Sequence, residues 1–494
     1  MGPHLGGPVG IPAARQSWLV PVLVFTTVIA AIVSSLGAPL IPSISTALEV
    51  PLGTAQWSLT AALLTGAVSA PILGRLGDGP RRRETLIGAL VAVTAGGVIA
   101  ALAPTLALLV VGRALQGIGL GLVPLTIAAA RDHLPPERAP GTIALLAVCA
   151  AAGSGAGYPI SGLIADRAGV WAAFWFGAAF SGIALLCVVL VVPSSRARPP
   201  AGLDVLGATL LSAGLVALLL AIAQGDVWGW GSPLVIGLLV GALLVLTLWT
   251  VQQLRSRAPL VDLRLLRRPV VLTGDGCAVV LGIAMYMYIS AVTAYVQTPR
   301  GAGYGFSATV VVAGLCLVPF SVLSIAASRA LPRLTQAVGP RALLPIGCLV
   351  VASGGAFFAL LHSALWQAFV MMGIVGVGFG LTFAAIPGII VRAVPDSETG
   401  SAMGFYQVVR YIGFSLGSAL TGSILAGYTR AGEHLPVEDG FRVVLWIAVT
   451  VCVVAAVLAW LLPGRAAAQG ARGEELADRD AQLGSAGLIG LTRE

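Results

Sequence analysis

Three ionisable side chains lie inside long apolar stretches of this sequence, where an uncompensated charge is costly. Arg113 is followed by Gln116, and Arg410 is preceded by Gln407 at the same spacing. Residues three apart share one face of a helix, so each arginine should present a cation beside an amide. The third charge, Asp275, is a carboxylate that can exchange a proton near neutral pH when it is partly desolvated. Together these groups could bind a polar part of a substrate and carry a proton.

Each group also has a plainer interpretation. An embedded arginine can clamp backbone carbonyl groups and water without touching a substrate, and Asp275 can be a solvated carboxylate at a helix entrance. Tyr286 lies deeper in the same apolar stretch and is a candidate to line the substrate pathway. Because Tyr288 is two residues further on, it points to a different face, and at most one of these two rings can face a cleft.

Patterns that carry catalysis are absent from the sequence. There is no H-E-x-x-H, Walker loop, nucleophile elbow or pair of catalytic carboxylates. The six cysteines lie in apolar segments without metal-ligand spacing and are expected to be buried free thiols. Solvated positions in termini or loops are predicted for the histidines His4, His133, His362 and His434. The chain is therefore expected not to be an enzyme and to need no metal or cofactor, only a proton gradient.

The composition indicates a polytopic membrane protein. Hydrophobic residues make up 57% of the 494 residues and charged residues only 10%, far fewer charges than soluble domains carry. Fourteen apolar segments are long enough to cross a bilayer as helices. They are predicted at 17–42, 55–77, 85–105, 106–131, 142–165, 170–193, 204–224, 233–253, 270–297, 307–329, 342–362, 364–392, 400–428 and 441–463.

The arginines predict the orientation of these helices. All 28 cationic residues are arginines. When the connections are numbered alternately, one side receives only Arg167, Arg300, Arg430 and Arg442, and nearly all the others fall on the opposite side. Cationic loops stay in the cytoplasm, so both termini are predicted to be cytoplasmic. Abundant arginine, alanine and glycine without lysine suggest a GC-rich bacterial genome, and hence a bacterial plasma membrane.

The net charge of +8 is explained by this topology. Cytoplasmic arginines contact anionic lipid headgroups, so membrane lipids are expected partners and nucleic acid is not. A small-molecule substrate is the other expected partner. A monomer is favoured, although the sequence does not specify the oligomeric state.

An internal repeat predicts the domain organisation. The glycines of Gly117-Ile-Gly119-Leu-Gly121 recur in Gly376-Val-Gly378-Phe-Gly380, and those at 153, 157 and 162 recur at 413, 417 and 422, with a nearly constant offset. Parallel repeats of this kind are a transporter design with the substrate site between the halves. We expect two six-helix bundles, 1–193 and 270–463, an inserted helix pair with its linkers at 194–269, and a disordered cytoplasmic tail at 464–494.

Several motifs resemble those of the major facilitator superfamily over about residues 17–463. They are Arg113-x-x-Gln116-Gly117-x-Gly119, then Gly74-Arg75-Leu76-Gly77-Asp78 with Arg81-Arg82-Arg83, and Gly153-x-x-x-Gly157-x-Pro159-x-x-Gly162. Trp57-x-x-Thr60-Ala61, the segment Pro259-Leu-Val-Asp262-Leu-Arg264-Leu and the added helix pair look like its fourteen-helix drug:proton antiporter branch. The resemblance implies an all-α membrane fold and transport by alternating access.

The resemblance also implies roles for the motif residues. Gly74, Arg75, Asp78 and Arg82 would form a cytoplasmic gate in which Asp78 latches the two bundles together. Gly153, Gly157, Pro159 and Gly162 would form the antiporter-motif helix, where glycines allow close packing and the proline can bend the backbone.

The sequence departs from the family pattern at the expected proton carrier. Members often have an acid in the first helix, and Val33 stands at the matching position. Tyr158 also replaces the usual proline of the antiporter motif. The usual acidic partner of Arg113 is thus missing, which leaves Asp275 as the candidate for proton coupling.

Two functions fit these residues and motifs. The first is a proton antiporter that exports small amphipathic compounds, with neutral or anionic ones favoured over lipophilic cations because Arg113 and Arg410 would make the cleft positive. The alternative is a lipid or lipid-precursor flippase on the same fold, which would need a lateral opening between the bundles.

Overall fold

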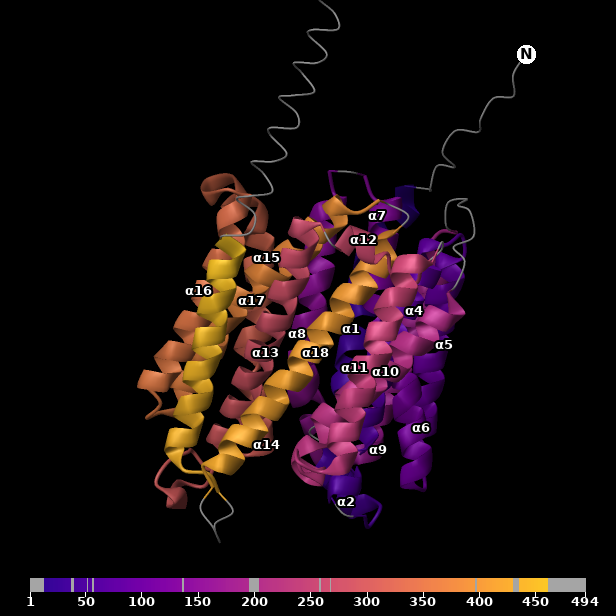
Figure 1. Ribbon diagram of the computed structural model, residues 1–494. Coiled ribbons are helices and arrows are strands. Elements are labelled where there is room, and N and C mark those ends of the chain that lie inside the picture. The colour runs from indigo at the N-terminus through magenta and orange to yellow at the C-terminus, as the bar shows by residue number, and fades with distance from the viewer. Residues whose placement is uncertain are drawn as a thin grey trace, which may run out of the picture.

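The protein is a bundle of long helices (Figure 1). The computed structural model describes residues 13–36, 40–50, 52–55, 57–135, 137–194, 204–256, 259–266, 268–395, 398–429 and 435–460. Apart from an isolated bridge between Thr429 and Pro436, the described residues form helices and their connections. The predicted tail at 464–494 lies outside these residues, as does most of the linker between 194 and 204.

The first group of helices runs from residue 13 to residue 191. Its elements are α1 (Ala13–Ser35), α2 (Ile41–Ala47), α3 (Leu52–Ala55), α4 (Trp57–Asp78), α5 (Arg82–Ala101), α6 (Leu106–Gly117), the 3₁₀ turn η2 (Ile118–Gly121), α7 (Leu122–His133), α8 (Ala139–Ala168) and α9 (Val170–Val191). We call these elements the first group.

Two further sets of helices complete the chain. The intermediate elements are α10 (Val205–Trp228), α11 (Pro233–Arg255) and the short α12 (Leu263–Leu266). The second group comprises α13 (Pro269–Gln297), η3 (Arg300–Ala302), α14 (Val310–Leu315), α15 (Val318–Val338), α16 (Pro340–Leu360), α17 (Leu365–Ala393), α18 (Thr399–Gly427) and a last helix, Glu438–Trp460.

Thirteen helical segments within the described residues are long and apolar enough to cross a membrane. The predicted helix at 142–165 is present as α8, in which Ala139–Ala150 forms a shorter apolar stretch. The multi-pass character of the chain is confirmed, whereas the fourteenth crossing stays a prediction.

Three helix boundaries differ from those predicted. The first helix ends at Ser35 and not near residue 42. The predicted helix at 106–131 contains the tighter turn η2 at its glycine motif, because glycines destabilise a regular α-helix. The predicted helix at 307–329 is divided into α14 and α15 just before Pro319, and α15 continues to Val338.

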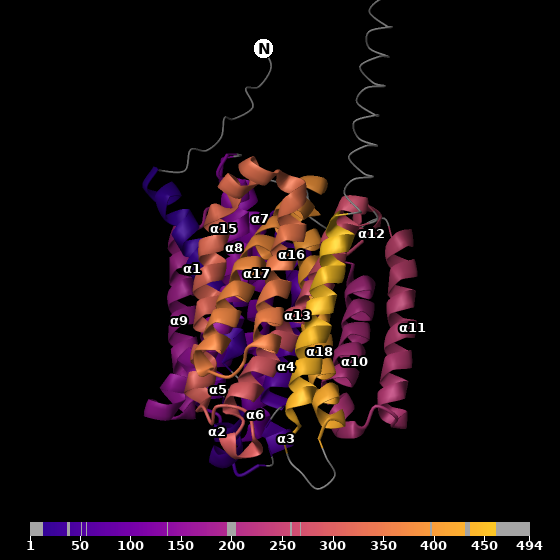
Figure 2. The same cartoon turned by 90° about the vertical axis from the view of Figure 1, so that its left-hand side faces the viewer.

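The two groups meet along two seams. On one side α4 and α7 of the first group pack against α18, and on the other side α8 packs against α14, α15 and α17. Helix α10 contacts both α4 and α18, so it covers the first seam, whereas α11 packs on α10 at the periphery (Figure 2). The intermediate helices therefore lie outside the main packing of the two groups.

Arginines gather at one end of the bundle, which we call the basic end. The end of α4, the start of α5, the end of α7 and the turn before α8 lie there and carry Arg75, Arg82, Arg131 and Arg138, respectively. This end is uppermost in Figure 1, where α7 and α12 are labelled, and α2 and α14 mark the opposite end.

Equivalent glycines of the repeat make equivalent helix contacts. A methyl group at Gly117 would meet the Ala62 backbone of α4, and one at Gly376 would meet the Phe320 backbone of α15. Membrane helices approach closely where such small residues remove side-chain bulk. The repeated glycines are therefore used for the same helix pairings in both groups.

The second glycine series shows the same correspondence. Gly153 and Gly157 of α8 lie against the backbone of α1 at Val28 and Ile32. Gly413 and Gly417 of α18 lie against the backbone of α13 at Val279 and Ile283, which have the same spacing.

Gly417→Ala should destabilise the protein because the new methyl group would overlap the Ile283 carbonyl. We expect a loss of about 1–3 kcal/mol in the free energy of unfolding, the usual cost of overpacking. The matched control is Gly162→Ala, since no atom lies within 4 Å of a methyl group there. Denaturation in mixed micelles measures both variants, and equal effects would contradict this account of the glycines.

Candidate functional site

Arg113 lies fully buried inside the first group and is surrounded by hydrogen-bond acceptors. Its Nη1 donates to the Val33 carbonyl at 3.1 Å and to Gln116 Oε1 at 2.8 Å. Its Nη2 and Nε donate to the carbonyls of Ser34 and Ser58, each at 3.3 Å. The guanidinium thus connects α6 with the end of α1 and the start of α4.

The position of these carbonyls explains why a cation is stable there. Helix α1 ends at Ser35, so the carbonyls of Val33 and Ser34 lie in its last turn, where no following residue of the helix can satisfy them fully. The helix dipole also places partial negative charge at this end. The backbone at Val33 therefore supplies the compensation that an acidic side chain supplies in the family pattern, and the clamp interpretation of Arg113 describes its contacts.

Arg410 is nearly as deeply buried, at 3% exposure, but has a different environment. Four aromatic rings surround its guanidinium at 5.4–5.7 Å from ring centre to carbon: Phe383 of α17, and Tyr406, Tyr411 and Phe414 of α18. Cations are attracted to the faces of such rings. Two of its nitrogens, Nε and Nη1, have no hydrogen-bond partner within the described part of the chain.

This aromatic cage around Arg410 lies where the two groups meet. Tyr411 packs in one cluster with Ala67 of α4, Leu120 of η2 and Leu219 of α10. Phe414 stacks on Tyr286 of α13, with ring centres 4.7 Å apart. The structure thus brings the predicted residues Tyr286 and Arg410 together through Phe414, at the seam between the first and second groups.

Two other predicted residues lie beside the cage. Gln407 donates from Nε2 to the Tyr411 hydroxyl at 3.2 Å, and its Oε1 has no partner among the residues described. Asp275 is 6% exposed, and its Oδ1 also has no partner among the residues described. Asp275 is close enough to Tyr406 to interact with it electrostatically. The second group therefore holds a buried acid and a buried cation near one tyrosine, Tyr406.

Arg113 and Arg410 are not joined by any described contact. The hydrogen bonds of Arg113 stay within α1, α4 and α6, while the ring contacts of Arg410 come from α17 and α18. We expected both arginines to face one cleft. In the described contacts, Arg113 clamps backbone carbonyls of the first group, and Arg410 lies in an aromatic cage of the second group.

The predicted gate residues connect the two groups at the basic end. Asp78 accepts the Gly400 N–H at 2.6 Å through Oδ1 and the Ser401 N–H at 2.8 Å through Oδ2. These amides belong to the first turn of α18, where free N–H groups and the helix dipole attract an anion. Gly74 permits this approach, because its Cα lies against the backbone of Gly400.

Two arginines flank Asp78. Arg75 Nη1 donates to both carboxylate oxygens of Glu398, at 3.0 and 2.9 Å, and this salt bridge joins α4 to the residue preceding α18. Arg131 of α7 donates to Thr399 Oγ1 and to the Val394 carbonyl. At the basic end the two groups are therefore held together in this structure.

Arg82, also predicted for the gate, makes contacts within the first group. It donates to the Gly77 and Ala128 carbonyls and forms a buried ion pair of 2.5 Å with Asp132. These partners all belong to the first group, so this arginine supports the turn that carries Asp78 and does not bridge to α18 through them.

The antiporter-motif helix, α8, faces both groups. Gly153 and Gly157 pack on α1, and Pro159 lies against Gly314 of α14. Ser321 of α15 donates to the Ala152 carbonyl at 2.8 Å. Gly162 has open space beside it. Three of the four motif residues are therefore at helix contacts, and α8 is bound on both faces.

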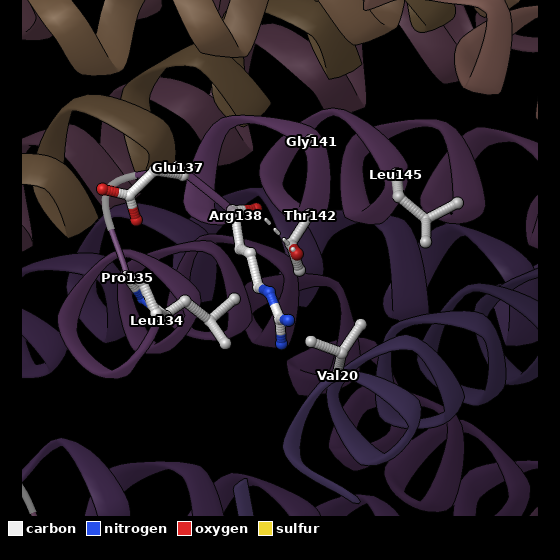
Figure 3. Close-up of a pocket in the computed structure, with 8 residues that line it drawn as sticks. All are labelled: Val20, Leu134, Pro135, Glu137, Arg138, Gly141, Thr142 and Leu145. Carbon is white, nitrogen blue, oxygen red and sulfur yellow. Dashed lines mark hydrogen bonds between the residues drawn. The ribbon is translucent and has the colours of Figure 1, made fainter. Parts of the chain in front are cut away.

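A pocket of about 480 Å³ opens at the basic end between α1 and the turn that precedes α8. Arg138 reaches between Leu134 and Val20, and Glu137, beside it in the turn, also lines the pocket (Figure 3). None of the predicted site residues lines this pocket, which is separate from the cage around Arg410.

Sequence reasoning missed the partners of the gate. Glu398, Arg131 and Asp132 were not singled out because their role depends on which helix ends meet. One signal was available for Glu398: an acid just before the first turn of a helix that follows Pro395, in the repeat position of Pro135.

Comparison with known proteins points to one family. Residues 23–418 match the family described as the Major Facilitator Superfamily. An uncharacterized MFS-type transporter of Mycobacterium tuberculosis is 27% identical over 86% of this chain. The matched region spans 61% of that relative's length. The tetracenomycin C resistance and export protein of Streptomyces glaucescens is 27% identical, over 80% of this chain and 73% of its own.

A solved structure shares the fold. The crystal structure of the human organic anion transporter TETRAN matches with a TM-score of 0.62, covering 91% of this chain and 100% of its own, at 15% identity. At that identity the likeness concerns the all-helical fold alone.

Arg113→Gln should destabilise the protein more than Arg410→Gln. The first removes the guanidinium that donates to the buried carbonyls of Val33, Ser34 and Ser58, so we expect a loss of about 3 kcal/mol in the free energy of unfolding. The second removes ring contacts and the electrostatic interactions of the guanidinium with Tyr406 and Tyr411, at a cost of about 1 kcal/mol. Denaturation in mixed micelles compares them, and a larger loss for Arg410→Gln would contradict the assigned roles.

Proposed function

We propose that this chain, which belongs to the Major Facilitator Superfamily, exports small amphipathic compounds in exchange for protons. It is a multi-pass membrane transporter and not an enzyme, and its homologues include drug-resistance and export proteins. The observation that carries the finer proposal is the pair of buried, incompletely partnered charges in the second group, Asp275 and Arg410.

The arginine distribution supports an orientation of the protein in the membrane. The basic end would face the cytoplasm, because cationic turns resist translocation. Both termini would then be cytoplasmic, in the plasma membrane of a bacterium, as the bacterial relatives suggest. With the contacts of Asp78, Arg75 and Arg131 formed, the structure would be closed toward the cytoplasm.

Alternating access would come from rocking of residues 1–193 against residues 270–463. The equivalent glycine contacts support two bundles of the same design, each tightly packed within itself. Opening toward the cytoplasm would require Asp78 to leave the first turn of α18 and Arg75 to leave Glu398. This contact set is small and polar, so water can replace it, and it suits a latch that opens and closes.

Asp275 is proposed as the proton carrier. When it is ionised, its charge and that of Arg410 cancel, and the second group presents a neutral site lined by aromatic rings. When it is protonated, the positive charge of Arg410 remains. A proton thus changes the charge of the site that the substrate meets, which is the requirement for coupling the two.

This charge balance favours neutral substrates. Apolar rings at the cage would bind a neutral amphipathic compound when the two charges cancel. An anion would instead bind best while Asp275 holds its proton, so the anion and the proton would move in the same direction. A cation would be repelled by Arg410. The relative named as a tetracenomycin C resistance and export protein supports export of a small organic compound.

A lipid flippase is less consistent with the arrangement. Such a protein needs a lateral opening between the groups for a lipid to enter. Helix α10 covers the seam between α4 and α18, and α8 is packed against α14 and α15 on the other side.

Asp275→Asn should abolish the response of transport to a pH gradient. In proteoliposomes we expect the wild type to export a neutral anthraquinone dye when a gradient is imposed, and the variant to retain only gradient-independent exchange, because an amide cannot carry the proton. Asp166→Asn, an exposed acid of α8, is the matched control. An unchanged gradient response in Asp275→Asn, or export of ethidium cation alone, would refute the proposal.

A further inference from the structure

A cluster of ionisable side chains lies at the opposite end of the second group, far along the chain from the residues used above. His362, in the turn between α16 and α17, has its Nε2 at 2.8 Å from Glu438 Oε1, at the start of the last helix. Its side chain is only 12% exposed, so the predicted solvated position of His362 is wrong. The fold encloses this histidine by bringing the last helix beside it.

Both ring nitrogens of His362 face acceptors. Nδ1 lies 3.0 Å from the Phe358 carbonyl, which can only accept, and Nε2 faces the Glu438 carboxyl group. A neutral histidine carries one N–H and can satisfy only one of these contacts. A hydrogen bond at the second contact takes a further proton, either on the imidazole ring or on the carboxyl group. Without that proton, Nε2 can instead accept from Arg442, whose Nη2 is within reach.

Arg442 is an alternative partner for both His362 and Glu438. Arg442, one turn along the last helix, has Nη2 at 3.3 Å from His362 Nε2 and at 4.0 Å from Glu438 Oε1. When the extra proton leaves, Nε2 presents a lone pair to which Arg442 can donate, and the same guanidinium can draw Glu438 toward it. Among the described residues, Asp439 is a further charged group in contact with this set, at 3.9 Å from Arg442 Nη1.

Two tyrosines connect the cluster to neighbouring elements. Tyr295, near the end of α13, donates to Glu438 Oε1 at 3.2 Å. Tyr304, in the connection that follows α13, donates to the Pro436 carbonyl, and burial raises the pKa of this hydroxyl, which keeps it a donor. Glu438 is thus bound to α13 and to the turn at His362, while the Arg442 guanidinium lies 4.0 Å away.

Water has access to this cluster. A pocket of about 440 Å³ opens beside it, and its lining includes Tyr304, Phe306, His362, Glu438 and Arg442. Protons can therefore exchange between the pair and the solution on that side of the membrane.

We propose that His362 and Glu438 form a proton-binding site, with Arg442 as the partner that replaces the proton. Proton binding holds the start of the last helix against α13 and the turn between α16 and α17. Proton loss lets Glu438 pair with Arg442 within its own helix and frees that attachment. The chemistry of the pair is independent of the transport proposed above. Only the assignment of this site to the outer solution rests on it.

Histidine NMR of the full chain in nanodiscs, labelled with ¹⁵N-histidine, tests the proposal directly. Over a pH titration, we expect the His362 signal to keep both ring nitrogens protonated to a higher pH than the His133 signal does. His133 is the matched control, because its Nδ1 also faces the carbonyl four residues earlier, at 3.1 Å, but its Nε2 has no partner in the described residues. His362→Gln and His133→Gln identify the two signals.

Two variants then separate the partners. Glu438→Gln should shift the His362 titration to lower pH by about one unit, a tenfold weaker hold on the proton. Arg442→Gln should shift it to higher pH, because the competing cation is gone. Titration of His362 at the same pH as His133, or no shift in either variant, would overturn the proposal. If Glu438→Gln does not fold, the shift in Arg442→Gln still decides the question, and none of these readings requires active transport.

Discussion

Every ion inside the membrane must find compensation within the protein, and this constraint organises the molecule. Hydrocarbon offers no water to a guanidinium, so its partners must come from helix ends, side chains or ring faces. Arg113 takes the first route, because α1 ends beside it and exposes the carbonyls of Val33 and Ser34. Arg410 takes the last, within a cage of aromatic rings that leaves two of its nitrogens without a hydrogen bond among the described residues. The first is fixed in place, and the second keeps the capacity to bind.

The repeat shows which parts of the chain serve packing and which are specific to one group. Gly117 and Gly376 support the same helix pairing, as do Gly157 and Gly417, so these positions follow from the need for close contact. The charges do not repeat. Met372 of α17 stands in the repeat position of Arg113, and Ala150 of α8 in that of Arg410. The two groups thus share a scaffold and differ in their polar groups, and the proposed coupling uses that asymmetry.

Much of the fold could be predicted from hydropathy and glycine spacing. A helix that crosses a membrane must be apolar, and helices that pack closely need small residues, and both features can be read from each segment of the sequence. Asp78 lies at the contact between the two groups, and its role as a latch stays a prediction. The contacts of Arg113 could not be foreseen, since they depend on α1 ending at Ser35 rather than seven residues later. His362 was misjudged for a similar reason: its partner Glu438 is 76 residues away in the chain. Hydropathy places a residue in a loop but does not say which helix end will cover that loop.

The central claim is that proton and substrate compete through the second group, with Asp275 holding the proton beside the caged Arg410. Its most direct test is the proton count during equilibrium binding. A neutral anthraquinone dye is added to the purified protein in weakly buffered detergent solution, and the pH change is recorded. The account predicts the release of about one proton per bound molecule in the wild type and none in Asp275→Asn. Equal release by both proteins, or proton uptake by the wild type, would contradict it.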